Sequence, residues 1–581
     1  MGRKDSYIQL VSKAGEEVLE GKTVWNSYPR PQLRRDNYWI LKDGWKLNGK
    51  EIRVPFPPQS LLSRYKDKVD KCLEYTISLG EFKKREKMRT ILHFGAVDQK
   101  AEVYLGENFI GKHEGGYLPF CFDITNHLSE ECILTVKADD SLDKKYPYGK
   151  QCEKRGGMWY TPVSGIWQNV WVEYVPERYV ESIRITPDMS AVDIVIEISG
   201  RSEVHKETSD NIIKVKLHTG EVYEQSFAGD RVHIDFSAIT TATGEKYEAQ
   251  NWSPENPYLY EAEIVVGEDK VETYFALRKI EIKDINGVNR VCLNGSPVFL
   301  NGVLDQGYFC DGIFLPAEEE EYKRDIERMK ELGFNMLRKH IKIEPECFYY
   351  YCDKLGMLVV QDMVNNGEYS FIRDTALPTL GRLRRNDKRS RSDAETKAIF
   401  EKHMTDTQMH LYNHPSVIMY TIFNEGWGQF DSDRMYKTAK ANDDTRLYDA
   451  TSGWFIQKDS DFDSYHVYFK KKSPRPGERP MFLSEFGGCT YVVPEHVFAE
   501  NKSYGYKTCR TAEELDRQIR ERYESLVFPV IKAGACGCVY TQLSDVEDEV
   551  NGFYTYDRKV CKVRKEAMQS IADKIKNLLK E

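Results

Sequence analysis

Short apolar stretches separated by polar turns run through the first half of the chain. Between residues 38 and 174 they lie at 73–79, 89–94, 101–105, 132–136 and 170–174. Strands of this length and spacing are typical of an all-β sandwich. A similar series predicts a second, smaller sandwich between residues 178 and 280, with strands at 183–185, 193–198, 212–217, 231–236 and 262–266.

The pattern changes near residue 285, where helical segments begin to alternate with short apolar runs. The run 298–304 is followed by residues 318–332, whose apolar side chains recur at helical spacing and which end at Gly333. This pattern indicates a βα unit. Seven more strands are predicted at 335–337, 357–360, 417–423, 446–448, 463–465, 480–483 and 538–541. Eight βα repeats over roughly 290 residues have the length of a TIM barrel.

Polar side chains follow nearly every predicted barrel strand. A single polar residue after a strand means little, since strands must stop, but a TIM barrel carries its catalytic groups at these ends. The groups found there are Asp305, Arg338, His340, Gln361, Asp362, Asn424, Glu425, Asp449, His466, Tyr468, Ser484, Glu485 and Gln542. We therefore expect an active site at the carboxyl end of the barrel.

Two of these residues, Glu425 and Glu485, suggest a specific chemistry. They lie 60 residues apart, so that on an eight-stranded barrel they can face each other across the mouth. Glycoside hydrolysis needs such a pair, because a carboxylic acid protonates the leaving oxygen while a carboxylate attacks the anomeric carbon from the other side. For either glutamate alone, a solvated loop charge is the simpler interpretation.

Composition and charge narrow the class of protein. The chain has 581 residues, 40% of them hydrophobic and 30% charged, and a formal net charge of −9. This balance predicts globular domains and disfavours nucleic acid as a partner. No segment approaches the roughly 18 apolar residues that span a membrane, and residues 1–10 lack an apolar run of signal-peptide length. Thirteen scattered cysteines, with Cys536 and Cys538 in an apolar strand, fit free thiols and a cytoplasmic location.

Several motifs resemble those of glycoside hydrolase family 2, the family of β-galactosidases, β-glucuronidases and β-mannosidases. The resemblance covers nearly the whole chain. The segments similar to its sugar-binding jelly-roll domain are 28–33, 54–57, 92–98, 103–106 and 165–167, and those similar to the end of its immunoglobulin-like domain are 256–260 and 275–278. His414-Pro-Ser-Val417 with Asn424-Glu425 resembles the acid/base signature, and Ser484-Glu485-Phe-Gly-Gly488 resembles the nucleophile signature.

This resemblance implies three domains: a jelly-roll β-sandwich (1–176), an immunoglobulin-like β-sandwich (177–281) and a catalytic (β/α)8 TIM barrel (282–581). It also implies that Glu425 is the general acid/base and Glu485 the nucleophile of a retaining reaction. Asn424 resembles the amide that holds the sugar 2-hydroxyl. Tyr468, or less directly His466, resembles the group that hydrogen-bonds the nucleophile. Homo-oligomerisation is an expectation from the resemblance alone.

Some positions depart from the family pattern and bear on the substrate. Ile341 stands where typical members carry a sugar-contacting histidine, and His340 lies one residue earlier. Tyr540 stands where a tryptophan often forms the floor of the sugar site. The β-glucuronidase branch carries the signature Asn-x-Lys, but the matching residues 549–552 of this chain include no lysine. The cation expected to bind the carboxylate of a uronic-acid substrate is therefore missing. The acidic loop 545–549 is either a solvated face or a rim that binds hydroxyls or a metal ion and repels anionic sugars.

Further sugar contacts are expected from the strand ends. Trp454 is expected to stack on a pyranose ring, with a packing role as the alternative. The remaining expected contacts are Asp305, Arg338, His340, His466, Tyr468, Tyr540 and Gln542.

Together these features predict a retaining exo-β-glycosidase that acts on a glycoside or oligosaccharide, with β-galactosidase as the leading activity. The alternatives are α-L-arabinopyranosidase, β-glucuronidase and β-mannosidase on the same fold, or an inactive carbohydrate-binding protein. No phosphate loop or dinucleotide fingerprint is present. We therefore expect no organic cofactor, and the sequence leaves a bound metal ion open.

Overall fold

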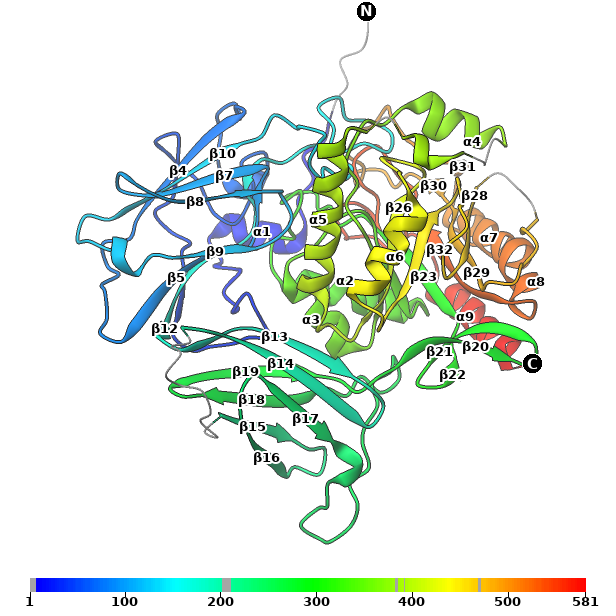
Figure 1. Cartoon of the computed structure of the whole chain (residues 1–581). Helices are drawn as coiled ribbons and strands as arrows, with labels where there is room; N and C mark the ends of the chain where they lie inside the picture. The colour runs from blue at the N-terminus through cyan, green and yellow to red at the C-terminus, as the bar shows by residue number, and fades with distance from the viewer. Residues whose placement is uncertain (1–6, 201–210, 382–384, 391, 469–471, 581) are drawn as a thin grey trace, which may run out of the picture.

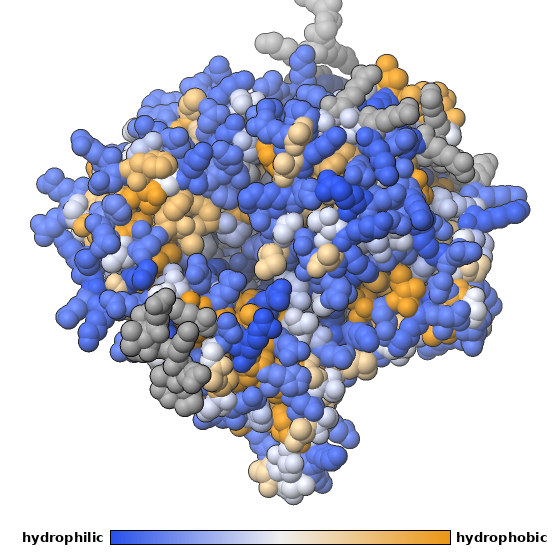
Figure 2. All heavy atoms as spheres, viewed as in Figure 1, coloured by the Kyte–Doolittle hydropathy of each residue, from blue (hydrophilic) through white to orange (hydrophobic). Residues whose placement is uncertain are grey.

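The computed structural model describes residues 7–200, 211–381, 385–390, 392–468 and 472–580. Two β-sandwiches lie beside a barrel of strands and helices (Figure 1). On the face drawn in Figure 2 the surface is mostly hydrophilic, with apolar residues in separate patches. Within the described part of the chain, no helix has the length and apolar character needed to cross a membrane.

The first sandwich packs two antiparallel sheets against each other. Its strands alternate buried and exposed side chains, as in Cys72–Ser78, because successive side chains point to opposite faces. One sheet has the order β1 (Tyr38–Ile40), β12 (Val170–Pro176), β5 (Met88–Phe94), β9 (Phe120–Asp123). The other has the order β3 (Lys50–Glu51), β2 (Lys46–Leu47), β4 (Cys72–Ser78), β10 (Ile133–Asp139), β7 (Lys100–Leu105), β8 (Asn108–Glu114).

The second sandwich is smaller and is built in the same way. Its three-stranded sheet contains β13 (Tyr179–Pro187), β14 (Ala191–Ser199) and β17 (Arg231–Asp235). The facing sheet has the order β16 (Val222–Phe227), β15 (Asn211–Lys216), β18 (Tyr260–Val266), β19 (Asp269–Phe275). A continuous apolar core, with Ile194, Val215 and Ile264 among its members, fills the space between them.

The third part is a barrel of eight parallel strands, as the sequence predicts. Their order is β27 (Leu447–Ser452), β26 (Val417–Asn424), β25 (Leu358–Asp362), β24 (Met336–Lys339), β23 (Leu300–Asp305), β32 (Ala535–Thr541), β29 (Met481–Gly487), β28 (Asp463–Val467). The ends of this order meet where the Ser452 hydroxyl of β27 lies 3.0 Å from the His466 ring of β28. The small sheet β20 (Ile280–Ile285), β21 (Val288–Leu293), β22 (Ser296–Pro297) packs its apolar side chains into the same core as the barrel interior.

Helices cover most of the barrel, but they do not follow every strand. The barrel helices are α2 (Glu320–Glu331), α3 (Glu346–Leu355), α4 (Leu377–Thr379), α5 (Ala394–Leu411), α6 (Ser432–Asn442), α7 (Ala512–Arg522), α8 (Phe528–Ile531) and α9 (Lys565–Lys580). The described residues between β27 and β28, and those between β28 and β29, form no helix. The prediction of eight strands is thus confirmed, whereas the expectation of a helix after each strand is wrong.

The amino-terminal segment lies against the barrel before the chain enters the first sandwich. The Ile8 amide donates to the Phe498 carbonyl at 2.8 Å, and α1 (Lys13–Glu20) follows. Ser12 caps α1 and also donates to the Asp311 carboxylate of the barrel at 2.6 Å. The indole of Trp25 donates to the Pro316 carbonyl at 3.2 Å. The amino-terminal segment is therefore tied to the barrel at several points.

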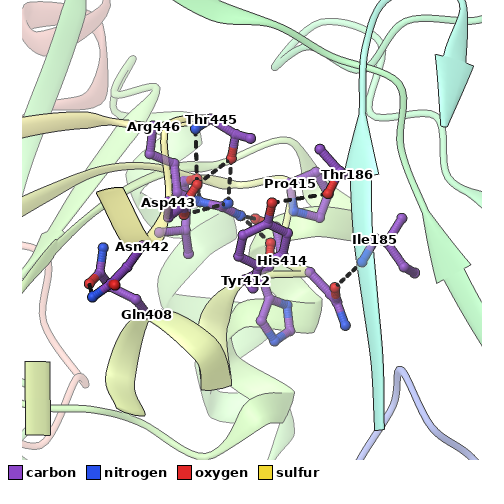
Figure 3. Close-up of polar contacts among 12 residues, drawn as sticks. Ile185, Thr186, Gln408, Tyr412, His414, Pro415, Asn442, Asp443, Thr445 and Arg446 are labelled. Atoms are coloured by element: carbon purple, nitrogen blue, oxygen red, sulfur yellow. Dashed lines mark hydrogen bonds and ion pairs between the residues drawn. The ribbon is translucent and has the colours of Figure 1, made fainter. Parts of the chain in front are cut away.

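The second sandwich meets the barrel at the turn between α5 and β26 (Figure 3). The Ile185 amide donates to the Asn413 side chain at 2.7 Å, and the hydroxyls of Thr186 and Tyr412 lie 3.0 Å apart. Next to this joint, buried Arg446 pairs with Asp443 at 2.9 Å. Its guanidinium also donates to the carbonyls of His414 at 3.1 Å and Val417 at 3.0 Å.

We predict that Arg446→Met destabilises the protein strongly. The substitution leaves the Asp443 carboxylate buried without its cation and removes donors from backbone carbonyls, which costs about 3 kcal/mol or more. Urea unfolding followed by tryptophan fluorescence measures the change. The control is Lys437→Met, because Lys437 makes a surface ion pair with Asp459. Equal unfolding midpoints for the two variants would contradict the prediction.

Candidate active site

Two carboxylates face each other at the mouth of the barrel. Glu485 lies within β29, and Glu425 directly follows β26. Three atoms lie within 4.8 Å of one another: one carboxylate oxygen of Glu425, one carboxylate oxygen of Glu485 and one ring nitrogen of His466. Glu425 adopts a left-handed backbone conformation, with φ of 51°, which is unfavourable for a side chain of this kind. It is held there because its amide donates to the Ser452 carbonyl at 3.0 Å and its carbonyl accepts from the Trp454 indole at 3.0 Å.

The Glu485 carboxylate is buried and surrounded by donors. One oxygen accepts from Arg338 Nη1 at 3.2 Å, and the other accepts from the Tyr468 hydroxyl. Burial by itself would raise the pKa of Glu485, but His466 and Arg338 outweigh it and hold the pKa below its ordinary value. Glu485 is therefore an anion near neutral pH.

Arg338 connects four barrel strands through one buried guanidinium. From β24 it donates to Asp362 of β25 at 3.0 Å and to the side-chain oxygen of Asn424 of β26 at 2.9 Å. It also donates to the Ser484 carbonyl of β29 at 2.8 Å. Among the described residues, the amide nitrogen of Asn424 has no hydrogen-bond partner. Asn424 thus keeps a donor available beside Glu425.

His466 lies between the two glutamates. Its Nδ1 is 2.8 Å from one oxygen of Glu425 and 3.5 Å from one oxygen of Glu485. Trp454 packs edge-on against its ring at a centroid distance of 5.3 Å. The structure therefore brings Tyr468 onto the expected nucleophile and places His466 closer to the expected acid. Among the described residues, Glu425, His466 and Glu485 also have ligand atoms spaced closely enough to hold a metal ion.

Other residues expected to touch sugar have partners within the protein. Asp305 accepts from Lys339 at 2.7 Å and from the Gly307 amide at 2.9 Å. His340 lies 2.8 Å from Asp362 and is buried, and burial lowers its pKa. Their side chains are thus held by barrel neighbours.

Two expected contacts from the eighth strand are also enclosed by protein. Tyr540 packs its ring against Phe486 and Phe553 in the core. Gln542 accepts from the Gln306 amide at 2.9 Å and is fully buried.

The acidic loop 545–549 is buried, so its interpretation as a solvated face is wrong. Asp545 pairs with Lys562 at 2.7 Å, and Glu547 accepts from the Thr161 amide at 2.9 Å. Glu549 accepts from the Tyr160 hydroxyl and from Asn551 at 3.0 Å. Burial raises the pKa of Glu549. This loop joins the barrel to the first sandwich.

The first sandwich contributes aromatic side chains that the sequence analysis missed. Trp159 stacks on Trp427, two residues after Glu425, at a centroid distance of 5.3 Å, and it meets Tyr369 edge-on at 4.9 Å. On the barrel side, Tyr506 stacks on Tyr468 at 3.9 Å. The available sequence signal was the aromatic pair Trp159-Tyr160, which follows Gly156-Gly157-Met158. These rings form an aromatic surround for the two glutamates.

Asp449 of β27 is a second carboxyl buried in the barrel interior. It is 1% exposed, and neither of its oxygens accepts a hydrogen bond of ordinary geometry from the described residues. Burial raises its pKa from 3.8 to about 6, and the nearby Ser464 hydroxyl, followed by Arg338 and His466, opposes that rise. Asp449 and Glu485 therefore respond in opposite directions to the same interior, because only Glu485 is directly paired with a cation.

Comparisons with known proteins agree on one family. The family model described as "Glycosyl hydrolases family 2, TIM barrel domain" matches residues 281–476, and the model "Glycosyl hydrolases family 2" matches residues 178–278. A β-galactosidase of Thermoanaerobacter pseudethanolicus is 23% identical over 452 residues, which are 72% of this chain and 56% of that protein. A putative β-glucuronidase of Formosa agariphila is 24% identical over 544 residues, 84% of this chain and 59% of that protein. The chain thus spans a little over half the length of these two relatives.

Solved structures share the fold over almost the whole chain. A β-glucuronidase from an uncultured Clostridium species has a TM-score of 0.69 at 18% identity, covering 94% of this chain and 99% of that one. A family 2 β-galacturonidase from Eisenbergiella tayi bound to galacturonate has a TM-score of 0.65 at 18% identity, covering 96% and 99%. Similarity at this level concerns the fold.

We predict that Asp449→Asn gains stability relative to the wild type as the pH rises. Because the folded pKa of Asp449 is raised from 3.8 to about 6, its contribution to stability is complete below pH 3.8 and is lost as the pH rises through about 6. The difference in unfolding free energy, variant minus wild type, should therefore increase between pH 4 and pH 7, by up to about 3 kcal/mol. Urea unfolding at several pH values measures it. A difference that is constant with pH would contradict the prediction.

Proposed function

The chain belongs to glycoside hydrolase family 2, and on that basis we propose that it is a retaining exo-β-glycosidase with Glu485 as nucleophile and Glu425 as general acid/base. One observation carries the proposal: one oxygen of the Glu425 carboxylate lies within 4.8 Å of one oxygen of the Glu485 carboxylate. Retaining enzymes hold their carboxyl groups roughly 5–5.5 Å apart, whereas inverting enzymes leave about 6.5–9.5 Å for a water molecule. The spacing therefore supports a direct attack on the sugar.

The proposed reaction has two steps. The Glu485 carboxylate attacks the anomeric carbon while the bond to the leaving oxygen breaks, and Glu425 gives its proton to that oxygen. Glu425, now a carboxylate, then removes a proton from water, which attacks the glycosyl-enzyme and releases Glu485. The lowered pKa of Glu485 suits the first step, because the nucleophile has to be ionised.

Neighbouring residues have supporting roles in this proposal. The free amide nitrogen of Asn424 is placed to donate to the sugar 2-hydroxyl. Tyr468 and Arg338 hold the two oxygens of Glu485, so that its attacking oxygen has a fixed direction. The aromatic rings of Trp159, Trp427 and Trp454 offer faces and edges for a sugar ring.

For the sugar, we propose a β-galactoside first. Relatives named β-galactosidase recur among the curated proteins, and the Asn-x-Lys signature of the β-glucuronidase branch lacks its lysine. A β-glucuronide or β-galacturonide is the second candidate, because similar solved structures carry those names. p-Nitrophenyl glycosides of galactose, glucuronic acid, galacturonic acid, mannose and arabinopyranose distinguish these activities.

We predict that Glu485→Gln reduces kcat by about 10⁴-fold or more, since the covalent intermediate cannot form. Glu425→Gln should reduce it by about 10²- to 10⁴-fold, with the smaller loss on substrates whose leaving group needs little protonation. The measurement is hydrolysis of the best glycoside of the panel, with NMR identifying the first anomer released, expected to be β. Glu478→Gln, at an exposed glutamate before β29, is the control. An α-anomer formed first, or an active Glu485→Gln enzyme, would exclude the proposed mechanism.

We also predict that Tyr468→Phe raises the pKa of Glu485, because the phenol donates a hydrogen bond to the ionised carboxylate. The acidic limb of the kcat/KM profile should move to higher pH, and kcat/KM at the optimum should fall by about 10-fold. Tyr465→Phe, on β28, is the matched control, because no hydrogen bond joins its hydroxyl to either glutamate among the described contacts. An unchanged acidic limb would remove Tyr468 from this role.

A further inference from the structure

A loop of the first sandwich, residues 146–151, is built into the mouth of the barrel. All six of its residues are buried. The Tyr148 amide donates to the Asn365 carbonyl at 3.0 Å, and its hydroxyl donates to the Gly367 carbonyl at 2.9 Å. Gln151 donates to Asp98 at 2.9 Å, which ties the end of the loop to its own sandwich. The loop is thus held from both sides.

Gly149 allows the loop to approach the barrel closely. It has φ of 64°, and a β-carbon at this position would lie 2.8 Å from the Ile341 carbonyl oxygen. Ile341 directly follows His340 on the loop after β24. A side chain at residue 149 would push the loop away from the barrel, so glycine brings the next residue, Lys150, to the site.

Lys150 is a buried lysine without an ionic partner at its tip. The residue is 7% exposed, and its Nζ lies 4.6 Å from the ring centre of Trp427 and 5.9 Å from that of Trp159. Within the described residues no hydrogen bond or ion pair is formed by this ammonium group. Buried ammonium groups are ordinarily paired, because an unpaired one has lost its hydration. Burial accordingly lowers the pKa of Lys150, opposed by the carboxylates of Glu549, Glu425 and Glu485.

Glu549 approaches the same space from the barrel side. It lies in the loop after β32 and is 4% exposed. The Tyr160 hydroxyl and the Asn551 amide orient its carboxylate. The Tyr160 amide in turn donates to the Lys150 carbonyl at 3.0 Å. Lys150 and Glu549 are therefore positioned by one shared set of contacts across the domain boundary.

We propose that Lys150 and Glu549 bind neighbouring hydroxyl groups of a neutral terminal sugar, so that the first sandwich completes the sugar site and Lys150 determines specificity. An ammonium group donates and a carboxylate accepts, and a sugar hydroxyl does both. The inference rests on the proposed glycosidase function and names its substrate class. A neutral sugar is favoured over a uronic acid because three carboxylates, those of Glu549, Glu425 and Glu485, act on Lys150. These carboxylates would repel an anionic sugar.

The test combines enzyme variants with deoxy substrates. Lys150→Met, Lys150→Arg and Glu549→Gln are compared with the wild type on the neutral p-nitrophenyl glycoside that it cleaves best, and on the analogues lacking one hydroxyl each. Lys144→Met is the control, since Lys144 lies on the approach to the same loop and pairs with exposed Glu368.

Lys150→Met should lower kcat/KM about 10- to 100-fold on the parent glycoside, as expected for the loss of a charged hydrogen bond. On one deoxy analogue the variant and the wild type should differ by less than about 3-fold, because the hydroxyl that the lysine binds is already absent. Glu549→Gln should give the same result with the deoxy analogue at an adjacent position. Lys150→Arg should recover part of the activity.

Three outcomes would overturn the inference. An equal loss on every deoxy analogue would assign Lys150 a structural role, and thermal unfolding of Lys150→Met and Lys150→Arg would show the same instability. An unchanged parent reaction would remove the lysine from the site. A uronide cleaved best by the wild type and lost in Lys150→Met would make the group a carboxylate receptor. In each case an inactive Glu485→Gln enzyme leaves the glycosidase proposal intact, whereas a wild type that hydrolyses no glycoside removes both.

Discussion

The active-site geometry depends on the pairing of one buried cation, Arg338. A guanidinium without solvent needs fixed acceptors for its donors, and here those acceptors come from β25, β26 and β29. Because the acceptors include Asn424 and Glu485, pairing the arginine also fixes Glu485 and the residue that precedes Glu425. The strand order of the barrel makes this arrangement reachable, since parallel strands bring their carboxyl ends to one edge.

The same interior controls charge in two opposite ways. Glu485 touches the Arg338 guanidinium and keeps a lowered pKa, whereas Asp449 has no such direct partner and its pKa rises to about 6. Burial acts on both carboxyls, so the difference comes from the pairing. The barrel interior therefore holds two buried carboxyls whose pKa values are shifted in opposite directions.

The site is also composite. The two glutamates stand on the barrel, whereas Lys150, Trp159 and Tyr160 come from the first sandwich and contact the barrel residues Trp427 and Glu549. The Ile185–Asn413 and Thr186–Tyr412 hydrogen bonds join the second sandwich to the barrel, and Arg446 holds the barrel segment beside that joint. The relative placement of the domains thus enters directly into the shape of the site.

The sequence by itself determined five strands of each sandwich, the eight barrel strands and the positions of Glu425 and Glu485 near the ends of two of them. These features follow from local alternation and from where apolar runs stop, which short-range sterics and burial decide. These local patterns did not reveal that a helix is missing after β27. They also did not reveal that Asp305, Tyr540 and Gln542 contact other residues inside the barrel. Only the tertiary structure decided that the acidic loop is buried and that Lys150 faces Glu549, because residues about 400 positions apart are brought together by domain docking, for which no local pattern exists.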